Sequence, residues 1–575
     1  MTEDQLERLC LEWFAEGGWE IAHGPDIAPA ALTPERADYR QVLLIGDLEA
    51  AIRRLNPHLP DDAVEQALAV VRKPESLDVV VSNRAFHRLL LDGVPVEYKR
   101  DDEIVHDRAL LVDFAELSAN HFRAVNQFTL QGRRQLRRPD VVCFINGLPL
   151  AVLELKSPGA ENVDIWDAFH QIQTYKDEVP ELFVTNEAVV ISDGYNARVG
   201  SLTANQERFM PWRTLRHEDD KPLLEWQLET LVRGFFDREL LLDYLRHFIL
   251  FESDADTLIK KIAGYHQFHA VREAVRATVI AARETDQRQV AERRATYADR
   301  VTPGSKKVGV VWHTQGSGKS ITMCCYAGKL LQQTEMNNPT LVVVTDRNDL
   351  DGQLFATFSA ARELLKQEPI QADDRDELRR LLAERESGGI VFTTVQKFAL
   401  LEEEAGHPIL NDRHNIVVIS DEAHCSQYGL KATLKQDGSY RFGYAKHMRD
   451  ALPNASFSAS PARPWPARTR TPARCSAITS PSTTSRMPSM TAPRCQSTTS
   501  PGWPSSISTA RPSRRCPTRS RRWWRTRRTW VLASAPRANG AGWRSWWAPG
   551  PGSGRWPRIW WNTSRPATPP WTARR

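Results

Sequence analysis

Apolar residues recur at helical spacing over several stretches of the chain. One face of residues 3–16 is apolar and is followed by Gly17-Gly18, which predicts an N-terminal helix that ends at these glycines. Residues 61–73 and 110–124 show the same spacing. Residues 222–250 are helical in pattern and rich in leucine, so we expect them to close a first domain over residues 1–250.

Strand-like runs fall into two groups. The first group lies between residues 139 and 195 and comprises Val141–Ile145, Leu150–Leu155 and Ala188–Ser192. The second group belongs to a domain expected over residues 255–457 and comprises Val308–Trp312, Thr340–Thr345, Ile390–Thr393 and Ile416–Ser420. Helical segments separate the runs of the second group, a pattern typical of a parallel, doubly wound α/β sheet.

Composition divides the chain near residue 457. The whole chain has 76 Lys and Arg against 71 Asp and Glu, a formal charge of +5. Residues 458–575 hold 22 Arg, 12 of the 18 Trp and 18 of the 36 Pro, with no Lys, Asp or Glu, so the first 457 residues carry a charge of −17. The basic balance therefore belongs to the tail, and the chain is not a uniformly basic nucleic-acid binder.

The sequence contains no signal for secretion or for a membrane. No run of about 18 apolar residues occurs, and the N-terminus is acidic without an apolar signal core. Five of the eight Cys lie in the first 457 residues without metal-ligand spacing, and we expect Cys324-Cys325 to be apolar filler on a buried helix. This usage is typical of the reducing cytosol, so we expect a cytoplasmic protein that does not contact membranes.

A phosphate-binding loop follows the first strand of the second domain. Val308–Trp312 runs into His313-Thr-Gln-Gly-Ser-Gly-Lys-Ser320 and then into a helical segment, the order of a P-loop, although His313 stands where the general motif has glycine. Glycines let backbone N–H groups approach phosphates without a Cβ clash. We expect Lys319 to contact the β- and γ-phosphates of ATP and Ser320 to ligate Mg²⁺. The expected ATP-binding residues of the loop are Gly316, Ser317, Gly318, Lys319 and Ser320.

Two carboxylates end another strand further along the chain. Ile416–Ser420 leads into Asp421-Glu422-Ala423-His424. We expect Asp421 to hold the Mg²⁺ of ATP through water and Glu422 to orient or deprotonate the attacking water. His424 would couple this site to motions elsewhere, and Gln267, upstream of the loop, offers an amide that reads adenine.

A second constellation lies in the first domain. Arg138-Pro139-Asp140 precedes one strand, Glu154-Leu155-Lys156 ends the next, and Asn146-Gly147 lies between the two strands. Glu154 and Lys156 are two apart on a strand and therefore share a face. Phosphodiester hydrolysis needs carboxylates that hold Mg²⁺ and a cation that activates water or steadies developing charge, and Asp140, Glu154 and Lys156 supply both. The alternative is an edge hairpin with exposed charges.

The turn of this hairpin constrains the nuclease hypothesis. A strict two-residue turn at Asn146-Gly147 pairs position 140 with 153, which puts Asp140 and Glu154 on opposite faces. A one-residue bulge or a three-residue loop brings them to the same face, and bulges are common beside active sites. Downstream, Gln171 and Tyr175 lie one helical turn apart, where they support the site or contact DNA.

The order of these motifs resembles the R subunit of type I restriction enzymes, the motor-nuclease polypeptide of those complexes. Residues 120–128 (Asn-His-Phe-Arg-Ala-Val-Asn-Gln-Phe), Arg138-Pro139-Asp140 and Glu154-Leu155-Lys156 resemble its nuclease domain. The segment His313–Ser320 resembles its ATP loop, including the histidine, and Asp421–His424 resembles its Walker B box. Glu7 is similar to an acidic residue of some such nucleases. The resemblance covers residues 1–457.

The resemblance implies a PD-(D/E)xK nuclease domain followed by a RecA-like P-loop domain of the superfamily 2 helicase type. It implies a type I site-specific deoxyribonuclease that assembles with modification (methyltransferase) and specificity subunits. Such an enzyme translocates double-stranded DNA with ATP and Mg²⁺ and cuts unmodified foreign DNA away from a site that the specificity subunit recognises. A superfamily 2 helicase or translocase without nuclease activity is the alternative.

The resemblance stops at Ala455-Ser456-Phe457, where the family continues with a Thr-Gly-Thr-Pro motif. One possible coding of the next residues, read in another frame, spells Phe-Thr-Gly-Thr-Pro-Val. A tail without Lys or acidic residues and rich in Arg, Pro and Trp is what GC-rich DNA encodes in a wrong frame. We therefore expect residues 458–575 to be frameshifted and disordered; the alternative is a nucleic-acid-binding arm in which Arg contacts phosphates and Trp stacks on bases.

The tail also bears on activity. An ATPase of this class works between two RecA-like lobes, and the second lobe is not recognisable in these 575 residues. We therefore expect this chain to bind ATP weakly and not to translocate DNA. An inactive remnant, or a fragment that binds ATP and DNA, is the alternative to an active enzyme subunit.

Overall fold

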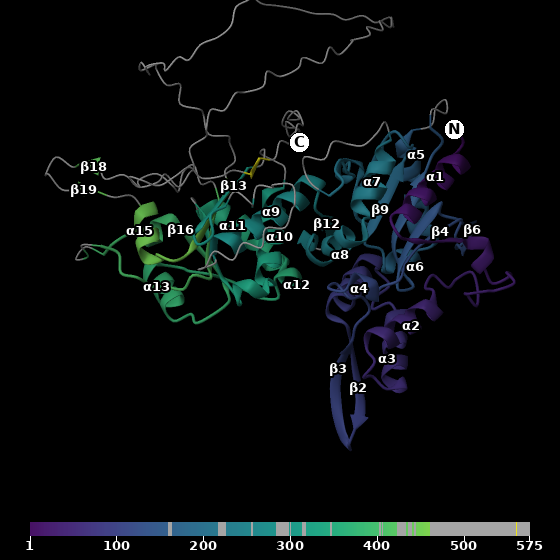
Figure 1. Cartoon of the computed structure of the whole chain (residues 1–575), viewed down its shortest axis with the longest axis horizontal. Helices are drawn as coiled ribbons and strands as arrows, with labels where there is room; N and C mark the ends of the chain where they lie inside the picture. Colours follow the sequence, from purple (N-terminus) through teal and green to yellow (C-terminus); the bar gives the residue numbers. More distant parts are fainter. Residues whose placement is uncertain are drawn as a thin grey trace, which may run out of the picture. The chain divides into compact units, whose positions relative to one another are not determined.

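The computed structural model describes residues 1–158, 164–216, 226–254, 257–282, 298, 301–312, 318–345, 348–401, 404, 406–421, 433–434, 440–441, 444–460 and 559–560. The chain divides into two compact units, one of Met1–Trp465 with Arg544–Arg575 and one of Pro466–Trp543. The second unit lies outside the described residues. The elements below therefore belong to the first unit (Figure 1).

A six-stranded sheet forms the core of the first 250 residues. Its spatial order is β1 (Glu20–His23), β4 (Phe122–Asn126), β7 (Val141–Ile145), β8 (Leu148–Leu155), β9 (Ala188–Ser192) and β10 (Ala197–Gly200). Strand β1 is parallel to β4 and β8 is parallel to β9, while the other neighbours are antiparallel. The three strands predicted between residues 139 and 195 are confirmed, with β8 beginning two residues early at Leu148.

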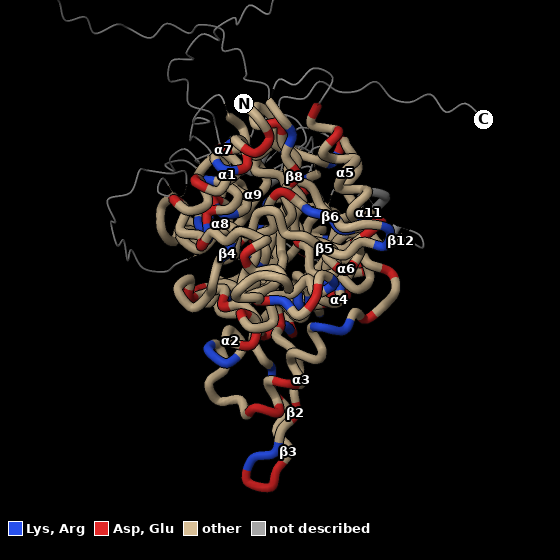
Figure 2. Tube along the Cα trace, turned by 90° about the vertical axis from the view of Figure 1, so that its right-hand side faces the viewer, with Lys and Arg blue, Asp and Glu red and all other residues tan. Residues whose placement is uncertain are grey.

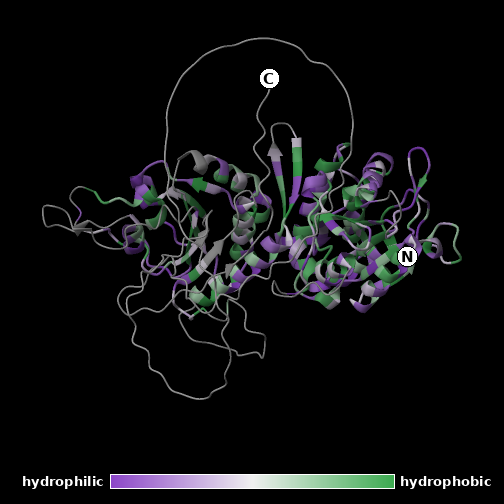
Figure 3. Cartoon of the chain, turned by 90° about the horizontal axis from the view of Figure 1, so that it is seen from above, coloured by the Kyte–Doolittle hydropathy of each residue, from purple (hydrophilic) through white to green (hydrophobic). Residues whose placement is uncertain are grey.

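Helices cover both faces of this sheet. Every residue of β4, β7, β8 and β9 is therefore buried. On one face, α1 (Glu3–Glu16), α7 (Gln227–Phe235) and α8 (Arg238–His247) share a hydrophobic core with alternate strand residues such as Cys143 and Leu153. On the other face, α5 (Ile165–Glu178) and α6 (Glu181–Val184) pack against Val142 and Val152. Figure 3 shows the hydrophobic residues along the strands.

The helical prediction holds at the N-terminus and fails at residues 110–124. Helix α1 begins after the Thr2 cap and ends at Gly17, and α3 (Asp61–Arg72) is also confirmed. Residues 110–124 instead form a turn, η2 (Leu117–Ala119), and then β4. The carboxylate of Asp113 accepts from the N–H groups of Ala115 and Glu116, and the Asn120 amide bonds Asp113 in turn. These side chains compete with a helix for the backbone groups.

Of the predicted helical range 222–250, residues 222–225 lie outside the described residues and the rest is helical in part. The helices α7 and α8 lie there, and β11 (Ile249–Asp254) begins before the range ends. Strand β11 pairs antiparallel with β12 (Thr257–Ile262), which leads into α9 (Tyr265–Ala282). The pattern did not indicate a second hairpin, β2 (Val94–Arg100) and β3 (Glu103–Ala109), that follows α2 (Ile45–Leu55) and α4 (Val79–Asp92). Its turn carries charges of both signs (Figure 2).

The second sheet has the order β15 (Pro369–Gln371), β16 (Ile390–Thr394), β14 (Thr340–Thr345), β17 (Ile416–Asp421), β20 (Ser456–Ser460), β13 (Lys307–Trp312) and β21 (Ile559–Trp560). All of its pairings are parallel, so the expected parallel sheet is confirmed. Helices α10 (Lys319–Leu331), α11 (Asn348–Ala360), α12 (Arg362–Leu365), α13 (Arg375–Ala383) and α15 (Tyr444–Ala451) connect the strands. Cys324 and Cys325 are fully buried on α10, as expected of apolar filler.

Two short segments of the tail depart from the prediction of disorder after residue 457. Strand β20 continues to Ser460, because its backbone pairs with β17 on one side and β13 on the other and needs no large side chains. Ile559–Trp560 pair with the end of β13. The rest of the tail lies outside the described residues. Among the helices that the structure describes, none is long and apolar enough to cross a bilayer.

Candidate active site

The hairpin β7–β8 contains the bulge that the nuclease hypothesis requires. Asn146 and Gly147 have φ values of 51° and 77°, as a tight two-residue turn demands. Ile145 pairs with Leu148 and Phe144 with Pro149, but Cys143 pairs with Ala151, so Leu150 is the extra residue. Val141 then pairs with Leu153, which sets Asp140 opposite Glu154 on the same face. The expected one-residue bulge is confirmed.

Asp140, Glu154 and Lys156 come together at the open end of this hairpin. Oδ2 of Asp140 accepts a hydrogen bond of 2.6 Å from the N–H of Leu155. The Lys156 ammonium donates to Oε1 of Glu154 at 2.8 Å and to the Leu155 carbonyl at 2.9 Å. Lys156 also forms a longer ion pair of 3.7 Å with Glu3, from the first turn of α1.

Burial sets the electrostatics of the three groups. It raises the pKa of Asp140 to about 7, and burial together with the charge of Asp140 raises the pKa of Glu154 to about 8. Burial also lowers the pKa of Lys156, but the charge of Glu154 outweighs it and raises that pKa above its usual value. The site therefore holds one cation beside two carboxyl groups that ionise readily only when further positive charge is close.

The oxygen atoms of this site fit a hard divalent cation. Oε2 of Glu154 is buried and has no hydrogen-bond partner, which leaves one carboxylate oxygen available. Carboxylate oxygens are the ligands that Mg²⁺ prefers. Within the described residues, no group of three His, Cys, Asp or Glu side chains could hold a metal ion. The protein ligands of the cation would therefore be Asp140 and Glu154.

Glu7 of α1 lies beside the carboxylates and is itself buried. Its carboxylate accepts from the Asn126 amide at 2.6 Å and from the Gln127 amide, and its charge contributes to the raised pKa of Asp140. Nδ1 of His23 lies 2.9 Å from Oδ1 of Asn126 and extends the network to β1. The sequence indicated Glu7 only through a resemblance, and no spacing in the sequence pointed to His23.

Gln171 and Tyr175 lie on α5 and support the entry to the hairpin. The Gln171 amide donates to the Tyr175 hydroxyl at 2.7 Å, and this hydroxyl donates to the carbonyl of Arg138, two residues before Asp140, at 3.2 Å. Burial and the charge of Glu154 raise the pKa of Tyr175, so the hydroxyl remains a donor. The expected spacing therefore places both side chains against the backbone that carries Asp140.

The second sheet carries the candidate ATP site at its carboxyl edge. Gly318 has φ 82° and precedes α10, which begins at Lys319 and Ser320. Nε2 of Gln267, on α9, donates to the Gly318 carbonyl at 2.9 Å and lies 3.2 Å from the Thr322 hydroxyl. Gln267 is thus brought to the end of the loop, and its expected role in reading adenine stays a prediction. Gly316 and Ser317 lie outside the described residues.

Asp421 ends β17, and one strand, β20, separates β17 from the loop strand β13. Because all three strands are parallel, Asp421 and the carboxyl end of β13 lie at the same edge of the sheet, where ligands bind in folds of this type. Glu422 and His424 lie outside the described residues.

The sequence matches two known families and several known proteins. Residues 1–208 match the family described as type I restriction enzyme R protein N terminus, and residues 266–474 match the SWI2/SNF2 ATPase family. The HindI type I restriction enzyme endonuclease subunit of Haemophilus influenzae is 49% identical over 461 residues, 80% of this chain. The chain belongs to the R-subunit family of type I restriction enzymes. This membership confirms the resemblance seen in the motifs.

Other members of the R-subunit family are more distant. The putative MjaIXP endonuclease subunit of Methanocaldococcus jannaschii is 33% identical over 484 residues, and the SauMSSORF170P subunit of Staphylococcus aureus is 27% identical over 344 residues. The chain covers 42% of the HindI subunit, 42% of the archaeal one and 33% of the staphylococcal one. It therefore spans about two fifths of the length of the first two. The ATPase match reaches residue 474, further than the expected end of the resemblance at 457.

Proposed function

We propose that residues 1–250 form a Mg²⁺-dependent DNA nuclease whose catalytic residues are Asp140, Glu154 and Lys156. The bulged hairpin carries this proposal, because it sets Asp140 opposite Glu154 with the Lys156 ammonium 2.8 Å from Glu154. Asp140 and Glu154 would hold Mg²⁺, which when bound supplies Lewis-acid polarisation of the phosphate and a more acidic water.

In the cleavage step, each residue of the chain has a separate task. Lys156 faces the charge that builds on the phosphate oxygens and stabilises it. Burial keeps bulk water away from the carboxylates, which strengthens their grip on the cation. Gln171 and Tyr175 position the Arg138 carbonyl, and through it the backbone that carries Asp140.

Residues 255–457 are the proposed ATP-binding motor domain. In this assignment Gly316–Ser320 cradle the phosphates, Lys319 contacts the β- and γ-phosphates, and Ser320 and Asp421 hold the Mg²⁺ of ATP. Glu422 activates water, His424 couples hydrolysis to motion, and Gln267 contacts the nucleotide from α9. The shared sheet edge of the loop and Asp421, together with the SWI2/SNF2 match, supports this assignment.

The setting follows from the family. We place the protein in the cytoplasm as an R subunit that assembles with modification and specificity subunits on double-stranded DNA, translocates DNA with ATP and cleaves unmodified DNA away from the recognition site. The tail is proposed to arise from a frameshift near codon 457, because residues 458–575 contain 22 Arg and no Lys, Asp or Glu. Resequencing codons 450–470 tests this origin, and an unshifted frame would exclude it.

Plasmid cleavage tests the nuclease proposal. Purified 575-residue chain is incubated with supercoiled DNA with and without Mg²⁺, alone and with modification and specificity subunits. We expect Mg²⁺-dependent nicking or linearisation that Asp140→Ala abolishes and that Asp177→Ala, an exposed carboxylate of α5, leaves unchanged. Cleavage that survives Asp140→Ala would contradict the assignment. DNA-stimulated ATP hydrolysis without cleavage would indicate a translocase without nuclease activity.

A further inference from the structure

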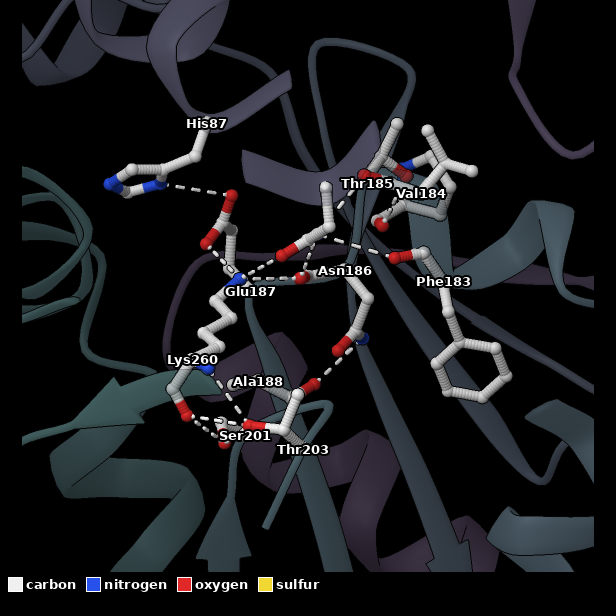
Figure 4. Close-up of polar contacts among 12 residues, drawn as sticks. His87, Phe183, Val184, Thr185, Asn186, Glu187, Ala188, Ser201, Thr203 and Lys260 are labelled. Carbon is white, nitrogen blue, oxygen red and sulfur yellow. Dashed lines mark hydrogen bonds and ion pairs between the residues drawn. The ribbon is translucent and has the colours of Figure 1, made fainter. Parts of the chain in front are cut away.

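Lys260 of β12 is a fully buried lysine that belongs to neither candidate site. Its ammonium donates to Oε2 of Glu187 at 2.6 Å and to the Asn186 carbonyl at 2.8 Å (Figure 4). It also donates to Oδ1 of Asn83 at 2.9 Å. All three donor positions of the ammonium are therefore used. The partners come from α4 and from the residues just before β9.

The charges around Lys260 are balanced inside the protein. Glu187 is also fully buried, and its second oxygen, Oε1, lies 3.1 Å from Nδ1 of His87 on α4. Phe251 of β11 covers the ammonium with its ring 5.4 Å away. A buried ion pair rarely stabilises a fold more than apolar residues of the same size, but the loss of one partner leaves an uncompensated buried charge and is strongly destabilising.

The main chain of Lys260 is held as firmly as its side chain. Its N–H donates to the Thr203 hydroxyl at 2.9 Å, and its carbonyl accepts from the hydroxyls of Ser201 and Thr203 at 2.6 and 2.9 Å (Figure 4). Ser201 and Thr203 follow β10 of the first sheet. The side chain and the main chain of Lys260 are thus both bonded to residues that flank strands of the sheet with the nuclease constellation.

The segment after Lys260 leads directly to the candidate ATP site. Ala263 pairs with Phe248 through its N–H at 3.0 Å, and the Gly264 N–H donates to Oε1 of Gln267 at 2.7 Å. The Gly264 carbonyl accepts from the N–H groups of Gln267 and Phe268 and starts α9. Nε2 of Gln267 in turn bonds the Gly318 carbonyl at the end of the phosphate loop.

We propose that Lys260 is a positioning residue for nucleotide binding: the buried contacts to Glu187, Asn83 and Asn186 fix β12, and through the Gly264 turn they hold Gln267 against Gly318. This inference rests on the proposed ATP site. In this arrangement, contacts with the nuclease domain hold Gln267 in its position at the ATP site.

The test uses the 575-residue chain and two readouts. The first is hydrogen exchange of the amides of residues 264–268, which needs no nucleotide. The second is the Kd for a fluorescent ATP analogue. Lys260→Met is expected to raise the exchange rates of the amides at 264–268 by about tenfold or more and to raise the Kd of the analogue by about tenfold. Lys261→Met is the matched control, because Lys261 is the next residue of β12, is partly exposed and pairs only with Glu252 among the described side chains.

A double-mutant cycle separates positioning from general damage. If Lys260 acts through Gln267, then Lys260→Met combined with Gln267→Ala binds the analogue no more weakly than Gln267→Ala alone. Should Lys260→Met fail to fold because Glu187 is left as an unpaired buried charge, Lys260→Met with Glu187→Gln removes both charges and serves instead.

The outcomes distinguish this inference from the ATP-site proposal. Unchanged exchange at 264–268 in the folded variant, or additive losses in the cycle, overturns the positioning role. If Lys260→Met exchanges faster but Gln267→Ala binds the analogue like wild type, the nucleotide role assigned to Gln267 is overturned. The effect of Lys260 on the nucleotide is then overturned with it. Faster exchange, weaker binding and a non-additive cycle support both.

Discussion

The N–H of Leu155 donates a hydrogen bond of 2.6 Å to Oδ2 of Asp140, so the residue between Glu154 and Lys156 is tied to the first carboxylate of the site. This bond joins the ends of two antiparallel strands at the point where their side chains must act together. The bulge at Leu150 sets the strand register in which these two residues meet. The relative placement of the three proposed catalytic groups is therefore a property of strand register rather than of a loop.

The stability of the metal-free protein should fall as the pH rises toward 8. The pKa values of Asp140 and Glu154 are raised to about 7 and about 8, against 3.8 and 4.5 ordinarily. Between these limits the folded chain binds more protons than the unfolded chain, so stability is full at low pH and is lost as the pH rises through the folded values. We expect the Tm to drop by about 5 °C between pH 6 and pH 8.5.

Mg²⁺ and charge removal provide the controls for this pH effect. Addition of Mg²⁺ at pH 8.5 should restore most of the Tm, because a bound cation favours the ionised carboxylates. Asp140→Asn with Glu154→Gln should flatten the pH dependence and abolish the response to Mg²⁺. A wild-type Tm that is the same with and without Mg²⁺ would speak against a cation site here.

Gly147→Ala should destabilise the first domain. Gly147 has φ 77°, and an added Cβ would lie 2.4 Å from the Leu44 carbonyl oxygen. We expect a loss of about 2 kcal/mol in the free energy of unfolding, measured by urea denaturation. Gly46→Ala is the control, because no heavy atom lies within 4 Å of its added Cβ and alanine favours helix α2. Equal stabilities of the two variants would argue against the turn.

Tyr175→Phe should reduce cleavage while leaving the fold intact. The change removes the hydroxyl that links Gln171 to the Arg138 carbonyl and leaves that carbonyl without this donor. We expect the rate of plasmid cleavage to fall about tenfold, because Asp140 is less firmly placed. Circular dichroism and the Tm should change little, and Thr174→Ala, a half-buried neighbour on α5, should keep the wild-type rate.

Lys319→Ala should abolish nucleotide binding. Lys319 is the first residue of α10, where the helix N-terminus and its own ammonium both favour phosphate. We expect the Kd for a fluorescent ATP analogue to rise at least a hundredfold, measured by titration at fixed Mg²⁺. Lys446→Ala, a partly exposed lysine of α15, is the control. Binding that survives Lys319→Ala would move the nucleotide site away from this loop.

The hydrophobic pattern of the sequence was sufficient to predict the buried strands. Runs such as Val141–Ile145, Ala188–Ser192 and Thr340–Thr345 appear in the structure with the expected limits, because strands buried on both faces leave a continuous apolar record. Residues 110–124 have a helical pattern but do not form a helix. Their apolar spacing was helical, but Asp113 and Asn120 bind the backbone locally and stop a helix from forming.

The candidate site could be predicted in part from the sequence. The Asp140, Glu154 and Lys156 set follows from residue chemistry, and the need for a bulge follows from the parity of the strand, but the choice of Leu150 as the bulged residue depends on packing. His23 reaches the site only through Asn126, and Lys260 meets Glu187 across 73 residues of chain. Contacts of this kind are made by tertiary structure and leave no local spacing in the sequence.

The Asn146-Gly147 turn also bears on how the protein ages. Asn-Gly is a sequence in which the side-chain amide is readily lost when the backbone is free to fold back on it, and asparagine is among the thermolabile residues. Here the Asn146 amide donates to the Leu111 carbonyl and to Asn120, and its oxygen accepts from the His121 N–H at 2.8 Å. The side chain is therefore held away from the Gly147 nitrogen. Peptide mapping after long storage should find this asparagine intact in folded protein and converted to aspartate and isoaspartate in unfolded protein. The extent of conversion at residue 146 would then record the time that the protein has spent unfolded.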